Sequence, residues 1–229
     1  AHRGYWKTEG SAQNSIRSLE RANEIKVYGS EFDVHLTADN VPVVFHDSKI
    51  QGKHIQTTPY AELKDLKLPN GETLPTLEQY LDRAKELKNA KLIFELKSHA
   101  TPERDREAAK IAVDMVNSKK LRKRTEYIAF SLDAAKELHR LSPKTPVYYL
   151  NGDLSPKQLK ELGFAGLDYN YKVMQQHPEW FKEAKDLKLK INVWTVDDPE
   201  MMKEMIENGV DFLTTDYPEE AQKAVLLYR

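Results

Sequence analysis

Short apolar runs alternate with longer helix-patterned segments from one end of the chain to the other. The runs are four to six residues long and rich in β-branched and aromatic residues, as buried strands are. Seven of them are residues 41–45, 91–96, 126–130, 146–150, 164–167, 189–194 and 210–214. Strand followed by helix, repeated about eight times, is typical of an α/β protein with a (β/α)8 barrel. An eighth strand is expected before His2, and a doubly wound sheet is the alternative.

The segments between these runs begin with helix-capping residues. Thr101, Ser155 and Asp198 each precede a proline, which is well tolerated in the first helical turn. No Gly/Ser-rich linker or break in composition divides the chain, so residues 1–229 are expected to form one domain. Residues 47–75 are polar, turn-rich and longer than a usual strand-to-helix connection. They predict a small insertion after the second strand region, over the active face of the barrel.

Composition excludes several classes of function. With 35 Lys and Arg against 36 Asp and Glu, the chain lacks the positive charge of a general nucleic-acid binder, although a small anionic substrate remains compatible. The absence of cysteine excludes disulfides, zinc–thiolate sites and thiol catalysis. No apolar run reaches the ~18 residues of a membrane span, so no stable membrane insertion is expected. Oligomeric state and compartment stay open, an extracytoplasmic location being slightly favoured over the cytoplasm.

Polar residues gather where the predicted strands end, which is where barrel enzymes place their chemistry. Glu31 and Asp33 are two residues apart, so on a strand both side chains point to the same face. Glu95 interrupts an apolar run, and Lys97 shares its face. Three inward carboxylates need a cation, and an all-oxygen site suits Mg²⁺ or Ca²⁺. The alternative is a structural ion-pair network with Arg3 and Lys97.

Three motifs resemble the glycerophosphodiester phosphodiesterase family: AHRG at residues 1–4, EFDVHLTADNVPVVFHD at residues 31–47 and FELK at residues 94–97. Further matches extend the resemblance over nearly the whole chain, at Asn14 and at residues 71–81, 193–197 and 215–218. The resemblance implies a (β/α)8 barrel with a small insertion after the HD motif. It also implies hydrolysis of glycerophosphodiesters to glycerol 3-phosphate and an alcohol, with one divalent cation, Mg²⁺ or Ca²⁺.

The resemblance assigns eight residues to the site. His2 and His46 match the catalytic histidines, and histidine suits general acid–base work because it titrates near neutral pH. The other six match phosphate- or substrate-binding residues (Arg3, Lys97 and Trp194) and metal ligands (Glu31, Asp33 and Glu95). Two positions depart from the family pattern: Gln13 stands where Glu is common, and residues 56–58 read Gln-Thr-Thr instead of Arg-Thr-Thr.

Two other functions compete with a small-molecule phosphodiesterase. A phospholipase acting on a lipid or lysolipid would need a larger apolar mouth, whereas residues 47–75 are strongly polar. A non-catalytic phosphate-ester-binding module would be expected to lack a histidine or a carboxylate, and all are present. Among the other histidines, His35 shares the face of Asp33 and is expected to pack there, and His99 is expected at the surface.

Overall fold

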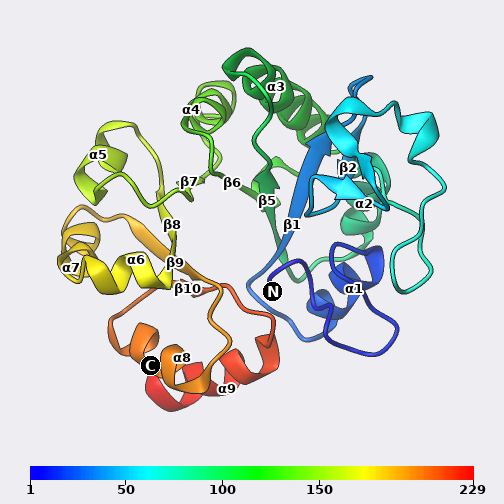
Figure 1. The fold of residues 1–229 in the computed structure, drawn as a ribbon. Helices are drawn as coiled ribbons and strands as arrows, with labels where there is room; N and C mark the ends of the chain where they lie inside the picture. The colour runs from blue at the N-terminus through cyan, green and yellow to red at the C-terminus, as the bar shows by residue number, and fades with distance from the viewer.

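Seven parallel strands curl around a central axis with the helices outside them, as Figure 1 shows for this computed structural model, which describes residues 1–229. The strands are β1 (Gly29–Leu36), β5 (Lys91–Leu96), β6 (Thr125–Ala129), β7 (Val147–Tyr149), β8 (Gly166–Asn170), β9 (Lys190–Trp194) and β10 (Phe212–Leu213). Neighbouring strands follow chain order from β1 to β10 without a reversal. The (β/α)8 barrel is confirmed, and the doubly wound alternative is wrong, since that fold requires a switch in strand order.

The run at residues 41–45 is not a barrel strand. It forms β2 (Pro42–Val44), which pairs antiparallel with β1 at the edge of the sheet. The connection from β1 to β2 is a tight turn in which the Thr37 amide donates to the Val41 carbonyl, 2.9 Å away. So short a link cannot make a parallel crossover, which needs a dozen or more residues. The barrel strand in this region is β1, which carries Glu31 and Asp33.

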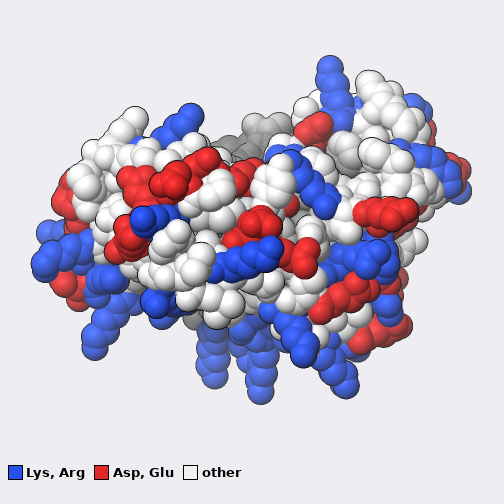
Figure 2. All heavy atoms as spheres, turned by 90° about the horizontal axis from the view of Figure 1, so that it is seen from below, with Lys and Arg blue, Asp and Glu red and all other residues white.

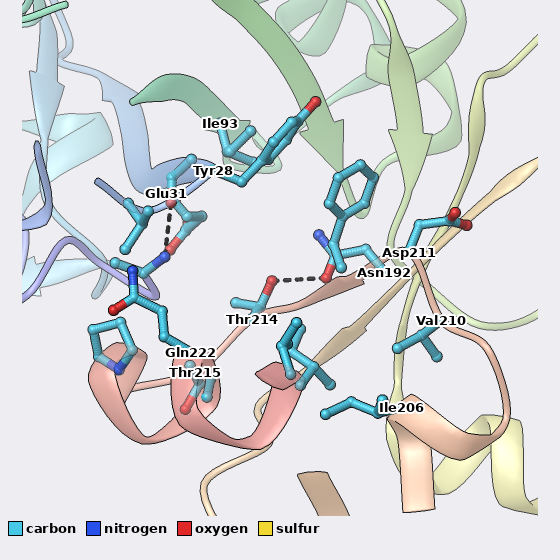
Figure 3. A pocket seen from close by; sticks show the side chains of 18 of the residues that line it. Tyr28, Glu31, Ile93, Asn192, Ile206, Val210, Asp211, Thr214, Thr215 and Gln222 are labelled. Carbon is cyan, nitrogen blue, oxygen red and sulfur yellow. Dashed lines mark hydrogen bonds between the residues drawn. The ribbon is translucent and has the colours of Figure 1, made fainter. Parts of the chain in front are cut away.

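Ala1 and His2 occupy the remaining barrel position, between β1 and the end of β10. The Glu31 amide donates to the Ala1 carbonyl at 2.8 Å, and the His2 amide donates to the Thr215 carbonyl at 2.9 Å. Beside this segment a cavity of about 440 Å³ opens between β10 and β1, with Tyr28, Ile206 and Val210 among its lining residues (Figure 3). An eighth strand before His2 stays a prediction.

Nine helices surround the strands, and most begin at a capping side chain, as the sequence predicts. The Thr101, Ser155 and Asp198 side chains each accept a hydrogen bond from a first-turn backbone amide. The helices are α1 (Ile16–Glu24), α2 (Leu77–Glu86), α3 (Pro102–Ser118), α4 (Leu132–Leu141), α5 (Pro156–Glu161), α6 (Tyr171–Gln176), α7 (Glu179–Asp186), α8 (Pro199–Glu207) and α9 (Pro218–Tyr228). Their buried faces form the main core with the outer face of the strands. None of them has the length and apolar character needed to cross a membrane.

The expected insertion lies between β2 and α2, beside the rim of the barrel (Figure 1). It contains β3 (Lys49–Ile50), β4 (Lys53–His54) and the short 3₁₀ helices η1 (Ile55–Thr57) and η2 (Tyr60–Glu62). A separate apolar cluster holds it together: Val43, Ile50, Ile55, Leu63 and Leu74. This core fixes the insertion next to the carboxyl end of β1.

The surface carries mixed charge. In the face shown in Figure 2, acidic and basic side chains are interspersed, and long basic side chains extend along its lower edge. The most basic segment of the chain, residues 119–124, is partly built into the fold. The Arg124 guanidinium donates to the carbonyls of Ala84 and Ala90 at 2.8 Å, and Lys119 Nζ lies 2.8 Å from an Asp82 oxygen. These contacts give the segment a structural role.

We predict that Gly4→Ala destabilises the protein more than Gly10→Ala. Both glycines have positive φ, +75° and +77°, which costs an alanine about 1 kcal/mol. A Cβ on Gly4 would also lie 2.1 Å from Ser18 Oγ, whereas one on Gly10 meets nothing within 4 Å. The overlap should add ~1–3 kcal/mol to the loss in free energy of unfolding. Urea denaturation of the two variants measures the difference, and equal losses would contradict the packing described for this turn.

Candidate active site

Three carboxylates meet inside the barrel where β1 and β5 run side by side. Asp33 pairs in register with Glu95, and Glu31 lies two residues before Asp33 on the same face. Carboxylate oxygens of the three residues lie within 4.8 Å of one another, and each residue is at most 7% exposed. The clustering predicted from residue spacing is therefore present.

Burial and mutual repulsion distort the titration of this cluster. Burial, then the charges of Asp33 and Glu95, raise the pKa of Glu31 well above its ordinary value. Burial and Asp33 raise the pKa of Glu95 to about 8. Burial also opposes ionisation of Asp33, but Lys97 and His46 together hold its pKa below the usual value. At neutral pH the metal-free cluster therefore holds protons that a bound cation would displace.

The chain supplies too little positive charge to neutralise the cluster by itself. Lys97 Nζ lies 3.2 Å from Glu95 Oε2 and 3.6 Å from Asp33 Oδ1. Glu31 Oε2 accepts a hydrogen bond from the Arg3 backbone amide at 2.8 Å. The other oxygen, Glu31 Oε1, is buried with no hydrogen-bond partner. A buried carboxylate oxygen without a donor, beside two further carboxylates, fits an oxygen-coordinated divalent cation. The ion-pair network proposed as the alternative includes Lys97 but leaves this oxygen unmatched.

His2 is fixed by a carboxylate from the segment after β10. Its Nδ1 lies 2.8 Å from Asp216 Oδ1, which also accepts the Trp6 indole N–H at 2.9 Å. Burial opposes ionisation of Asp216, but the bond to His2 outweighs it, and the pKa of the carboxyl is lowered. An ionised Asp216 holds a proton on Nδ1 of His2 and leaves Nε2 as the nitrogen free to exchange one. Sequence reasoning gave Asp216 no role.

His46 follows β2 and faces the carboxylate cluster. Its Nδ1 lies 2.7 Å from Asp47 Oδ1. Burial lowers the pKa of His46, with the charge of Asp33 acting in the opposite direction. The buried His35 supports the His46 backbone, because Nε2 of His35 lies 3.2 Å from the His46 carbonyl oxygen. The expected packing role of His35 is thus seen.

Both departures from the family pattern contact the site. Gln13 Oε1 accepts a hydrogen bond from Arg3 Nη1 at 2.7 Å, so an amide holds the guanidinium where the family commonly has a carboxylate. Gln56 Nε2 lies 2.9 Å from His35 Nδ1 and donates to the Ser98 carbonyl at 3.0 Å, which ties the insertion to the barrel. The substitutions therefore act on Arg3 and on the support behind His46.

One small cavity collects seven of the eight predicted residues. It has a volume of about 110 Å³, and its lining includes His2, Arg3, Glu31, His46, Glu95, Lys97 and Trp194. Asp33 does not line it but adjoins it through Glu31 and Glu95. The Trp194 indole packs edge-to-face on Phe130, 5.8 Å between ring centroids, and forms a wall. Sequence reasoning missed Phe130, Leu150 and Asp168, which also line the cavity.

Two histidines, two cationic side chains and two of the three clustered carboxylates line one cavity in a (β/α)8 barrel, an arrangement that suits hydrolysis of a phosphoric ester. The chain belongs to the glycerophosphoryl diester phosphodiesterase family, whose profile matches residues 2–220. It is similar to the solved structure of a glycerophosphodiester phosphodiesterase from Parabacteroides distasonis ATCC 8503, with 70% sequence identity, a TM-score of 0.98, and coverage of 99% of this chain and 95% of that one.

More distant relatives agree with this family. A glycerophosphodiester phosphodiesterase of Caldanaerobacter subterraneus subsp. tengcongensis is 26% identical over 96% of this chain and 93% of that protein. An Oleispira antarctica phosphodiesterase, solved in complex with the product sn-glycerol-3-phosphate, is 25% identical with a TM-score of 0.81, covering 98% of this chain and 95% of that one. The chain is thus an enzyme, a glycerophosphodiester phosphodiesterase.

Cation binding to the carboxylates should strengthen as pH rises from about 6 to about 8. Glu95, with a pKa near 8, must lose its proton to bind a cation, so binding releases protons. Folding raises the pKa of Glu95, so the folded state binds this proton more tightly than the unfolded state does. The metal-free protein therefore loses stability as pH rises from about 4.3, the pKa of Glu in the unfolded chain, to about 8. The increase in Tm on adding Mg²⁺ or Ca²⁺ should therefore be larger at pH 8 than at pH 6.

Calorimetric titration in buffers of different ionisation heat measures the released protons. Glu95→Gln is the matched variant: it keeps the shape of the side chain and should weaken the cation effect and its pH dependence together. A Tm increase in the wild type that is the same at both pH values would contradict the protonated cluster.

Proposed function

We propose that the enzyme hydrolyses glycerophosphodiesters to sn-glycerol 3-phosphate and an alcohol, with His2 and His46 as general acid and base and a divalent cation at Glu31, Asp33 and Glu95. The observation that carries the proposal is that both histidines and two of the three carboxylates line one cavity. The Oleispira antarctica relative supports the product, since it was solved with sn-glycerol-3-phosphate. Glycerophosphocholine, glycerophosphoethanolamine and glycerophosphoglycerol are candidate substrates.

Phosphate binding falls to Arg3 and Lys97. The Arg3 guanidinium can pair with two phosphate oxygens, and the Lys97 ammonium adds a point charge beside the carboxylates. Glu31, Asp33 and Glu95 would hold the cation, Mg²⁺ or Ca²⁺, which when bound offsets the negative charge on the phosphate. The charges of Arg3, Lys97 and the cation together balance those of the three carboxylates and the single charge of a phosphodiester.

The two histidines divide the proton transfers of hydrolysis. Water forms a bond to phosphorus while the bond from phosphorus to the alcohol oxygen breaks, so one proton leaves the water and one reaches the departing oxygen. One imidazole accepts the first proton and the other donates the second. Asp216 holds the ring of His2 with Nε2 available, and Asp47 contacts Nδ1 of His46 in the same way. Each ring therefore has one anchored nitrogen and one that can exchange a proton.

The proposal is tested by measuring release of sn-glycerol 3-phosphate from glycerophosphocholine with Mg²⁺, with Ca²⁺ and with excess chelator. We expect turnover with one or both cations and its loss on chelation, restored by adding the cation back. Lysophosphatidylcholine serves as the comparison substrate, because the small cavity and polar insertion disfavour an acyl chain. Cleavage of the lysolipid without cleavage of glycerophosphocholine, or full turnover in chelator, would overturn the proposal.

His2→Ala and His46→Ala should each lower kcat by on the order of 10²–10⁴, the usual loss for a general acid or base. The double variant should be little worse than either single variant, because both residues act in one reaction step. His177→Ala is the control, since its ring stacks on Trp180 and does not line the cavity. Wild-type rates in either single variant would refute the pairing.

A further inference from the structure

The cavity has two chemically different sides. The side formed by Arg3, Lys97 and the histidines is charged and suits a phosphate group. The apolar part of the lining is formed by Ile128, Phe130, Leu150 and Trp194, which pack in one cluster. Besides Glu31 and Glu95, one further carboxyl group lines this cavity, that of Asp168.

Asp168 has no structural partner that would explain a carboxyl group at this position. The residue is 1% exposed, and its Oδ1 atom is buried without a hydrogen-bond partner. The Trp194 indole N–H donates to the backbone carbonyl of Asp168 at 2.8 Å, not to its side chain. Nearby Thr214 Oγ1 donates to Asn192 Oδ1 at 2.9 Å, so its hydrogen is already used. A buried polar atom that the fold leaves unsatisfied, in the wall of a cavity, indicates a ligand contact.

The chemistry of Asp168 suits a hydroxyl group and not a phosphate. Burial, together with the charge of Glu126, raises the pKa of Asp168 to about 8. A neutral carboxyl group both donates and accepts a hydrogen bond, as a hydroxyl group does, and an ionised one still accepts from it. The ionised form repels an anionic phosphate, and the neutral form offers it no positive charge.

We propose that the Asp168 carboxyl group determines specificity by hydrogen bonding to a hydroxyl group of the substrate glycerol. This inference rests on the function proposed above. With the phosphate at Arg3 and Lys97, the glycerol carbons lie against Trp194 and a hydroxyl group reaches Asp168. Asp168 stands two residues before the end of β8, on the inner wall of a cavity of only about 110 Å³. The small glycerol common to all substrates fits there, and the variable alcohol extends toward the open mouth.

The test compares glycerophosphocholine with propylphosphocholine, which has the same three-carbon chain without hydroxyl groups. Both release choline, so one assay gives kcat/KM for both substrates. The wild type should prefer glycerophosphocholine by ~100-fold or more, because a site that binds a hydroxyl group rejects an analogue lacking it. Asp168→Leu and Asp168→Ala should each reduce that preference at least tenfold, through slower cleavage of glycerophosphocholine. Asp168→Asn, which keeps a donor and an acceptor, should retain more of the preference than either.

Asp211→Asn is the matched control, because Asp211 lies just before β10 and lines the larger cavity and not this one. It should keep the wild-type preference. If Asp168→Leu fails to fold, as judged by Tm, Asp168→Ala decides the question. A wild-type preference in the variants that fold, with both substrates slowed equally, would overturn the role of Asp168 while leaving the phosphodiesterase intact. Absence of sn-glycerol 3-phosphate release by the wild type would instead overturn the proposed function.

Discussion

Electrostatic repulsion among Glu31, Asp33 and Glu95 is the interaction on which the arrangement of the site depends. At separations within 4.8 Å, two unit charges repel by about 3 kcal/mol or more at an effective dielectric constant of about 20. Lys97 can offset one of the three charges, so the fold keeps protons on the cluster or needs a cation there. This repulsion destabilises the fold, so the three carboxylates are placed for binding and not for folding. The remaining site residues surround their charge.

The N-terminal residues and the segment after β10 meet beside this cluster. Ala1 and His2 are held between β1 and β10, and the side chain of Asp216, just after β10, anchors His2. Arg3 donates its backbone amide to Glu31, which makes a metal-ligand candidate part of the same hydrogen-bonded unit. Closure of the barrel and the geometry of the site therefore depend on the same contacts, and a change that loosens the N-terminal turn should displace the histidine and the arginine together.

Residues whose positions follow from strand parity and motif were predictable, and residues placed by tertiary contact were not. Alternation along a strand was enough to bring Glu31 and Asp33 to one face. His99 was expected at the surface, but its side chain is 1% exposed, and its Nε2 accepts the Leu36 amide at 3.0 Å. That contact joins the ends of two neighbouring strands, which no local pattern reveals. Asp168 was missed similarly, because the cavity that it lines is built mostly by residues of other strands.

Anomalous diffraction from crystals grown with Mn²⁺ can locate the cation site, because Mn²⁺ replaces Mg²⁺ or Ca²⁺ at oxygen sites. We expect one strong peak bounded by oxygens of Glu31, Asp33 and Glu95, including the Glu31 Oε1 atom that has no partner in the protein. The peak should vanish in Glu95→Gln crystals or weaken strongly. A peak elsewhere, or three carboxylates with no ion between them at saturating Mn²⁺ and pH 8, would contradict this cation site.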